Sequence, residues 1–245
     1  MFAACVSRRQ FLRTAATTLA APYVLTRSAR AGTPPSERIT LGMIGVGNMG
    51  GAHVSSLVKN RDFQIVAVCD VRRDKREAAQ KQIEETYAEE QSPGTFRGCN
   101  TYHEFEELLA RPDIDAVVIA VPDHWHAIIA IAACRAGKDV YCEKPLSLTV
   151  REAEELVRAA RRYGRVFQVG SQQRSDPNFR LACELVRNGR IGEVRTVNVG
   201  IGGPSGDKYF NEEPVPDGFD WDRWLGPAPW QPYNAERCSG SYSGG

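Results

Sequence analysis

Ile39-Thr40-Leu41-Gly42-Met43-Ile44, followed at once by Gly45-Val46-Gly47-Asn48-Met49-Gly50, decides the fold of this 245-residue chain. The first six residues are an apolar run that predicts a buried strand, and residues 52–58 predict a helix. Glycines at this spacing allow a tight strand-to-helix turn, close approach of backbone to a pyrophosphate, and packing of helix on strand. The N–H groups and positive dipole end of such a helix bind phosphate. We therefore expect a dinucleotide site formed by Gly45, Gly47, Asn48, Met49 and Gly50.

A second apolar run, residues 63–69, ends at Asp70, which lies 20 residues after Gly50. This is the spacing expected of a carboxylate that binds the hydroxyls of the adenine ribose. A carboxylate there repels a 2′-phosphate, so we expect NAD as the cofactor. Arg72 and Arg73 keep NADP open, because an arginine can pair with a phosphate. An equally good interpretation is that both arginines are solvent-exposed residues at the start of a helix over residues 74–89.

The alternation of strands and helices continues along the chain. Helices are predicted over residues 104–109, 126–136 and 149–162, and strands over 115–121, 139–142 and 166–169. The last helix is amphipathic, with a stripe of Ala153, Leu156, Val157 and Ala160. This order predicts an α/β fold of the Rossmann type, a doubly wound parallel sheet that binds ligands at the carboxyl ends of its strands.

Two of these strand ends carry polar residues. The first is Val121-Pro122-Asp123-His124-Trp125-His126, in which Pro122 ends the strand and Asp123 is a candidate N-cap. Two histidines without a third ligand nearby do not predict a metal site, so none is expected.

The second polar strand end is Tyr141-Cys142-Glu143-Lys144-Pro145-Leu146. A lysine whose pKa is lowered by desolvation can exchange a proton with a substrate hydroxyl. Lys144 is therefore a candidate catalytic residue. A surface salt bridge between Glu143 and Lys144 is an equal alternative.

Residues 1–31 indicate an export signal. Ser7-Arg8-Arg9-Gln10-Phe11-Leu12-Arg13 matches the twin-arginine pattern, and a weakly apolar stretch over 14–25 is too short to span a bilayer. Ala29-Arg30-Ala31 supplies a cleavage site. We expect recognition by the twin-arginine export machinery, no stable membrane anchor, and a periplasmic or secreted mature chain. Export in the folded state would carry along a cofactor acquired in the cytoplasm.

Charge and cysteine usage exclude other classes of protein. The net charge of +1 includes five arginines in residues 1–31, and the remainder carries −4. Nucleic-acid binding needs clustered positive charge, so no nucleic-acid partner is expected. Seven cysteines without a C-x-x-C pair do not predict a zinc ribbon or a thioredoxin site. Cys69 and Cys142 fall in apolar runs and are expected to be buried as small hydrophobes.

Three blocks together resemble one family: residues 44–50, Pro122-Asp123-His124-Trp125-His126, and Ala136-Gly137-Lys138-Asp139-Val140-Tyr141-Cys142-Glu143-Lys144-Pro145-Leu146. In this order and spacing, the sequence from residue 38 to about residue 235 resembles the Gfo/Idh/MocA oxidoreductases. The resemblance implies NAD(P)-dependent hydride transfer at a hydroxyl or carbonyl carbon of a sugar, cyclitol or related small molecule. It implies that Lys144 is catalytic and contacts substrate, that Glu143 lies by the cofactor ribose, and that His126 lies near the nicotinamide. It also places Val121, Pro122 and Pro145 at the cofactor.

The resemblance divides the chain into a signal (1–31), a linker (32–37), a dinucleotide-binding domain (38–165) and a second domain (166–245) with an open, mostly antiparallel sheet. In the second domain we expect a crossing strand over 170–177, a helix over 178–188 and a sheet strand over 194–201. Arg174 either touches substrate or cofactor or forms a structural ion pair. Trp221 and Trp224 either line a sugar pocket or pack beneath a Pro-rich loop.

Family members usually run longer and supply a downstream aspartate and histidine to a lysine-centred proton relay. We therefore expect this chain to be incomplete at its C-terminus, and expect a homo-oligomer through the second-domain sheet. Two other functions stay open. Some relatives cleave glycosidic bonds through transient oxidation by NAD. The absence of a downstream aspartate and histidine from this chain favours a non-catalytic nucleotide-binding module, whereas the presence of Glu143-Lys144-Pro145 argues against it.

Overall fold

The computed structural model describes residues 37–90, 98–200 and 209–238. The expected export signal and nearly all of the expected linker lie outside these residues. The strands are β1 Ile39–Ile44, β2 Phe63–Cys69, β3 Asn100–Tyr102, β4 Ala116–Ile119, β5 Asp139–Glu143 and β6 Phe167–Gly170. The α-helices are α2 Asn48–Leu57, α3 Arg73–Glu90, α4 Phe105–Leu109, α5 Asp123–Arg135, α6 Val150–Tyr163, α7 Pro177–Arg187 and α8 Trp221–Leu225, and the 3-10 turns are η2 Gln172–Ser175 and η3 Ala235–Cys238.

The six strands form one parallel sheet in the order β3-β2-β1-β4-β5-β6. This order confirms the doubly wound Rossmann prediction. The strand order reverses between β1 and β4, and ligands of such sheets bind in the crevice at that point. β1 ends in the glycine turn, so the site expected from the sequence lies at this crevice.

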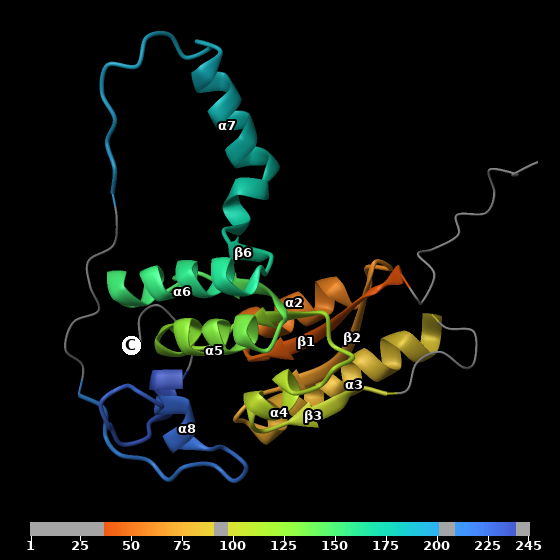
Figure 1. Ribbon diagram of the computed structural model, residues 1–245. Helices are drawn as coiled ribbons and strands as arrows, with labels where there is room; N and C mark the ends of the chain where they lie inside the picture. The colour runs from red at the N-terminus through yellow and green to blue at the C-terminus, as the bar shows by residue number, and fades with distance from the viewer. Residues whose placement is uncertain (1–36, 91–97, 201–208, 239–245) are drawn as a thin grey trace, which may run out of the picture.

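Two apolar cores lie on the two faces of the sheet, between the strands and the helices drawn in Figure 1. The helices α4, α5 and α6 cover one face, and α2 and α3 cover the other. Successive residues of β1 point into opposite cores: Met43 packs against α2 and α3, and Ile44 packs toward α5. Cys69 and Cys142 are buried in the α5 core, which confirms them as small hydrophobes, and burial raises the pKa of Cys142 to about 12.

Some local predictions differ from the structure. Asp123 is the first residue of α5 rather than its N-cap, which is Pro122 without a side-chain cap bond. The reason is that proline fixes a φ suited to a helix entry and stops the strand in the same step. β3 was not predicted, because three residues of mixed polarity carry no periodic signal. In α6 the buried side chains are Leu156 and Ala159, so the predicted stripe is displaced by part of a turn.

The loop between β5 and α6 ends at a well-formed helix start. Thr149 accepts a hydrogen bond from the Glu152 N–H at 3.2 Å, and the Glu152 carboxylate accepts the Thr149 N–H at 3.1 Å. This capping box satisfies two of the N–H groups that a helix start leaves open. The same carboxylate accepts the Leu148 N–H at 2.7 Å, so the end of the loop after Lys144 is anchored to α6.

The region after β5 agrees with the sequence in its first strand and differs after it. β6 pairs with β5 in parallel, so the strand expected over 166–169 belongs to the parallel sheet, which extends to Gly170. The crossing strand expected over 170–177 is instead the end of β6 and the turn η2. Over the described part of the strand expected at 194–201, residues 194–200 are extended but form no strand, because no neighbouring strand lies among the described residues to pair with them.

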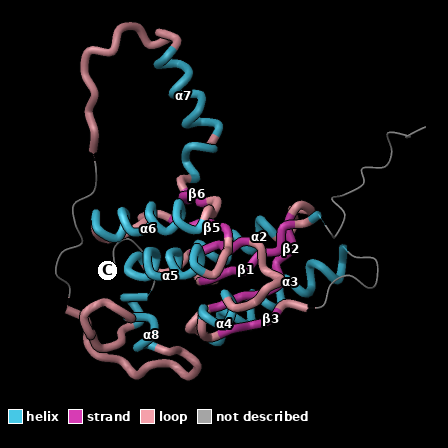
Figure 2. Tube along the Cα trace, viewed as in Figure 1, coloured by secondary structure: helices cyan, strands magenta, loops and turns pink. Residues whose placement is uncertain are grey.

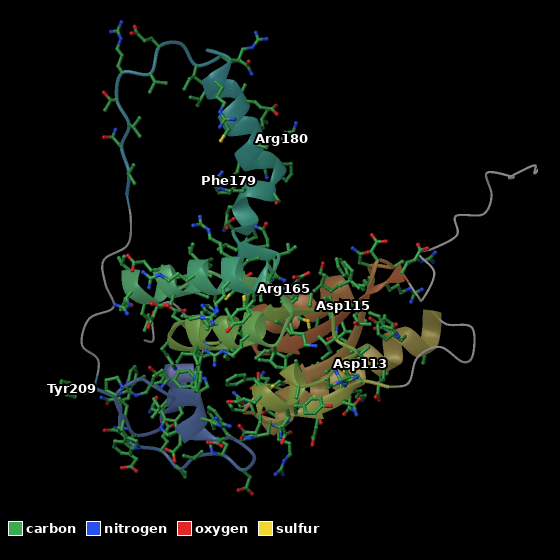
Figure 3. The ribbon with its side chains drawn as sticks, viewed as in Figure 1. Asp113, Asp115, Arg165, Phe179, Arg180 and Tyr209 are labelled. Atoms are coloured by element: carbon green, nitrogen blue, oxygen red, sulfur yellow. The ribbon has the colours of Figure 1, made fainter. Side chains whose placement is uncertain are left out.

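The helix α7 projects away from the two layers, as Figure 3 shows at its labelled residues Phe179 and Arg180. Phe179 is 56% exposed. Within the described ranges, no helix is both long and apolar enough to cross a membrane. The second-domain sheet expected from the sequence is likewise not found among those residues.

Candidate functional site

The glycine turn has the geometry of a phosphate-binding loop. Gly45 has φ +81°, which a residue with a side chain rarely adopts, and a Cβ at Gly50 would collide with the Gly45 carbonyl oxygen. A Cβ at Gly47 would meet nothing within 4 Å, so open space lies above this residue. The turn therefore requires glycine for packing at Gly45 and Gly50, whereas Gly47 leaves a surface that a ligand can approach.

The helix α2 begins directly at this open space. Its N-cap is Gly47, no side chain caps it, and no acidic residue occupies its first turn. The helix start thus presents backbone N–H groups and a partial positive charge without a competing carboxylate. The residues present fit the pyrophosphate of a dinucleotide, as the sequence predicts for Gly45 to Gly50.

Asp70 stands beside this loop at the end of β2. Its Oδ2 accepts the Val46 N–H at 2.8 Å, and its Oδ1 accepts the Arg72 N–H at 2.9 Å. Each oxygen keeps a second lone pair for a ribose hydroxyl. Burial raises the pKa of Asp70, while the two N–H donors and the nearby arginines favour its ionised form. The carboxylate is therefore oriented by backbone before any ligand binds.

Arg72 is occupied elsewhere. Its guanidinium binds Asp74 through two bonds, Nε to Oδ1 at 3.0 Å and Nη2 to Oδ2 at 2.7 Å, which lowers the pKa of Asp74. A guanidinium held in this way is not directed at a 2′-phosphate. The pairing with Asp74 therefore makes Arg72 a poor partner for a 2′-phosphate, which fits the expectation of NAD.

At the end of β5, Glu143 is 3% exposed and points inward. Its Oε1 accepts a hydrogen bond from His53 Nε2 at 2.8 Å, and its Oε2 accepts the Lys144 N–H at 3.2 Å. The His53 ring also contacts Tyr141 edge-on, with centroids 5.3 Å apart. The carboxylate is therefore a buried link between α2 and the loop that carries Lys144, rather than half of a surface salt bridge.

A second histidine holds the same loop. His126 Nδ1 donates to the Pro145 carbonyl at 2.6 Å, and the ring is 1% exposed. Burial lowers the pKa of His126, so the ring is neutral and Nε2 is its acceptor atom. Nε2 is buried without a partner among the described residues, which fits a hydrogen-bond donor from a bound ligand or water.

The remaining predicted residues occupy different places. Lys144 and Pro145 are exposed at the carboxyl end of β5, and Val121 and Pro122 lie partly buried between β4 and α5. Arg174 lies exposed in η2, just beyond β6. The structure brings the glycine turn, Asp70 and the loop after β5 to one edge of the sheet, and Arg174 follows the neighbouring strand.

Sequence reasoning missed His53. His53 comes three residues after Gly50, and this spacing places both on the same face of the helix. A single histidine at that spacing does not by itself predict a role in the site. The two histidines at the start of α5, for which the sequence predicted no metal site, both face backbone: His126 binds the Pro145 carbonyl, and His124 Nε2 donates to the Trp224 carbonyl at 2.9 Å. No group of three or more His, Cys, Asp or Glu side chains suited to a metal occurs in the described part of the chain.

The placement of Asp70 makes a testable prediction. Replacing Asp70 with Ala should weaken NADH binding by roughly 10- to 100-fold, since hydrogen bonds to a charged group contribute about 1.5–3 kcal/mol. The affinity for NADPH should change little, so the difference between the affinities for NADH and NADPH should become smaller. Isothermal titration calorimetry with both dinucleotides measures this.

Asp74→Ala is the matched control, because it removes a nearby carboxylate and leaves both hydrogen bonds of Asp70 in place. It should retain NADH affinity and release Arg72. Equal affinities of the unchanged chain for NADH and NADPH would contradict the assignment of Asp70 as the residue that selects NAD. They would indicate that Arg72 and Arg73 accommodate the 2′-phosphate instead.

Comparisons with known proteins agree with this geometry. The model of an oxidoreductase family with an NAD-binding Rossmann fold matches residues 39–171, and that of the family's C-terminal alpha/beta domain matches residues 202–245. The chain is 27% identical over 186 residues to a myo-inositol 2-dehydrogenase of Thermotoga maritima, covering 76% of this chain and 49% of that protein. It is 31% identical over 161 residues to a glycosyl hydrolase family 109 protein of Shewanella sp., covering 66% of this chain and 34% of that protein.

Among solved structures, a scyllo-inositol dehydrogenase from Lactobacillus casei, with bound NAD(H) and scyllo-inositol, matches with a TM-score of 0.55 and 26% identity. The match covers 64% of this chain and 43% of that one. The chain thus spans about half the length, or less, of the relatives it matches.

Proposed function

Because the chain belongs to the Gfo/Idh/MocA oxidoreductase family, we propose that it supplies the dinucleotide site and the catalytic lysine of an NAD(H)-dependent sugar or cyclitol dehydrogenase. The observation that carries the proposal is the shared sheet edge: the oriented Asp70 carboxylate lies at one end of the crevice and the Lys144 loop at the other. The inositol dehydrogenases among the relatives support a cyclitol or sugar as the substrate.

Each residue has a task in this proposal. The glycine turn and the start of α2 bind the pyrophosphate, and Asp70 binds the ribose hydroxyls. When bound, NAD would supply the chemistry of hydride transfer to or from the substrate carbon. Lys144 hydrogen-bonds the substrate hydroxyl and takes or gives its proton as the carbonyl forms or disappears. His53 and His126 hold the loop on either side of Lys144, through Glu143 and the Pro145 carbonyl.

The test of this function is net NAD⁺ reduction. A form of the protein extended to the length of the inositol dehydrogenases should reduce NAD⁺ with at least one member of a panel of inositols and aldoses. The 245-residue chain alone should bind NADH but show little or no turnover. NADH binding without any net reduction, by an extended and folded protein, would contradict the dehydrogenase assignment.

A second candidate is NAD-dependent cleavage of a glycosidic bond, which the similarity to the Shewanella glycosyl hydrolase family 109 protein favours. In that reaction the hydride removed from the sugar is later returned, so NADH does not accumulate. Release of p-nitrophenol from p-nitrophenyl glycosides, without net NADH, would distinguish it from the dehydrogenase.

Export through the twin-arginine pathway is also part of the proposal, as is self-association through the second-domain sheet. Both rest on the sequence and the family resemblance. Replacing Arg8 and Arg9 with Lys should leave the precursor in the cytoplasm, whereas Arg13→Lys, outside the pair, should not. Fractionation of cells into cytoplasm and periplasm measures this, and unchanged export of the Arg8/Arg9 variant would remove the assignment.

A further inference from the structure

Residues 209–238, here called the strap, pack against the dinucleotide-binding domain. The strap lies in the part matched by the C-terminal domain of the family, and Figure 2 shows that it is mostly loop around the short helix α8. It carries its own apolar cluster, whose buried members are Phe219, Trp221, Leu225 and Tyr233. Trp125 of α5 donates its Nε1–H to the strap carbonyls of Arg223 and Trp224, at 3.0 and 3.2 Å.

The strap runs along the loop that follows β2. The Arg73 N–H donates to the Gly218 carbonyl at 2.8 Å, and the Asp220 N–H donates to the Val71 carbonyl at 3.1 Å. Between these bonds, Arg72 and Phe219 form an antiparallel bridge, with the Arg72 guanidinium 5.3 Å from the centre of the Phe219 ring. The strap is therefore joined by backbone hydrogen bonds to a loop far away in the sequence.

The same loop orients Asp70. Arg72 donates its N–H to Asp70 Oδ1 at 2.9 Å, and its neighbours on both sides are bonded to the strap. Asp70 Oδ2 in turn accepts the Val46 N–H of the glycine turn. An unbroken series of contacts thus leads from the strap, through the backbone around Arg72, to the carboxylate expected to bind ribose.

A cavity of about 240 Å³ lies between the strap and this loop. Val71, Arg73, Arg76 and His103 line one side, and Gly218, Phe219 and Asp220 line the other. Sites for whole drug-sized ligands measure roughly 300–1,000 Å³, so this cavity suits one end of a dinucleotide rather than all of it. An aromatic ring together with arginine side chains suits a flat heteroaromatic base, because guanidinium groups stack on such rings.

We propose that the strap is part of the dinucleotide site. Gly218–Asp220 orders the Val71–Arg73 loop and forms the outer wall of the cavity that receives the adenosine end of NAD(H). The inference rests on the proposed function, because its ligand is the proposed cofactor. It assigns to a segment of the second domain a role in cofactor binding that is separate from any role in substrate binding.

Gly218→Val tests the proposal. Gly218 has φ +78°, and a Cβ there would lie 3.0 Å from the Cβ of Arg73, so valine strains the backbone and pushes the strap from the loop. The dissociation constants of NADH and ADP-ribose should both rise by about tenfold, which is what loss of one or two ordering hydrogen bonds causes. Equal weakening of ADP-ribose, which lacks nicotinamide, locates the effect in the adenosine half.

Gly189→Val is the matched control. Gly189 has φ +67° at the end of α7, and its Cβ would meet nothing within 4 Å, so the backbone strain is similar but no contact with the strap changes. This variant should bind both ligands as the unchanged chain does. If Gly218→Val fails to fold, Phe219→Ala serves in its place, because it removes the ring over Arg72 without backbone strain. It should also lower the affinity for both ligands. Circular dichroism and thermal unfolding check the fold of each variant.

We expect weaker binding of NADH and ADP-ribose by Gly218→Val and Phe219→Ala, and unchanged binding of both ligands by Gly189→Val. Equal affinities in all folded variants would overturn the inference while leaving the proposed function in place. Failure of the unchanged, folded chain to bind either ligand would overturn the proposed function, and the inference with it.

Discussion

Replacing Lys144 with Ala should lower turnover by roughly 10²–10⁴-fold while leaving the dissociation constant of NADH within a few-fold of its original value. The two effects separate because the groups expected to bind the dinucleotide, the glycine turn and Asp70, follow β1 and β2, whereas Lys144 follows β5. The side chain is exposed at the edge of the sheet and its loop is anchored through Glu143 and Pro145, so alanine should not disturb the fold.

The measurement is the initial rate of NAD⁺ reduction by a form extended to the length of the inositol dehydrogenases, together with NADH binding followed by fluorescence. Lys81→Ala is the control, because Lys81 is a 75%-exposed lysine on α3 that pairs with Glu85 on the same helix. Full activity of the Lys144 variant would remove Lys144 from the mechanism. If NADH binding were lost together with turnover, Lys144 would be a cofactor-binding residue rather than a residue that transfers a proton.

Gly47→Ala should weaken NADH binding by roughly 10- to 100-fold with little effect on stability. A methyl group at Gly47 meets no protein atom within 4 Å, so the fold has no reason to change. The space it fills is the space through which the pyrophosphate approaches the start of α2. An extra methyl group in a tightly packed site costs about 1–3 kcal/mol, and 1.4 kcal/mol corresponds to tenfold in affinity.

Two neighbouring glycines provide the comparison. Gly51→Ala places a methyl group 3.7 Å from the Val46 carbonyl oxygen, an ordinary contact, and should leave NADH binding unchanged. Gly50→Ala drives a methyl group into the Gly45 carbonyl, so it should destabilise the domain itself. Thermal unfolding distinguishes this loss from that at Gly47. Normal NADH affinity of Gly47→Ala would show that the open space is not the pyrophosphate site.

The architecture of the sheet was predictable because its signals are local and periodic. The apolar runs that form β1 and β2, and the glycines between β1 and α2, determine their own conformations. β3 escaped prediction because it becomes a strand only by pairing with β2. Conversely, the strand that the family resemblance implied over residues 194–201 is not formed over its described part, where no neighbouring described strand pairs with it.

The site was predictable in its residues but not in its contacts. The sequence indicated Asp70 and Glu143, yet nothing in it says that the Glu143 carboxylate binds His53, a residue 90 positions away. The partners of Arg72 show the same limit. Its pairing with Asp74 is local, but its contact with Phe219 depends on how the second domain docks. Long-range contacts of this kind follow from packing, which spacing alone does not encode.

We expect the edge of the sheet that carries the glycine turn and Asp70 to bind NAD(H). Calorimetric titration of NADH into the folded 245-residue chain tests it most directly. We expect saturable binding of one NADH per chain, tighter than the binding of NADPH under the same conditions. A folded chain that takes up no NADH would contradict it.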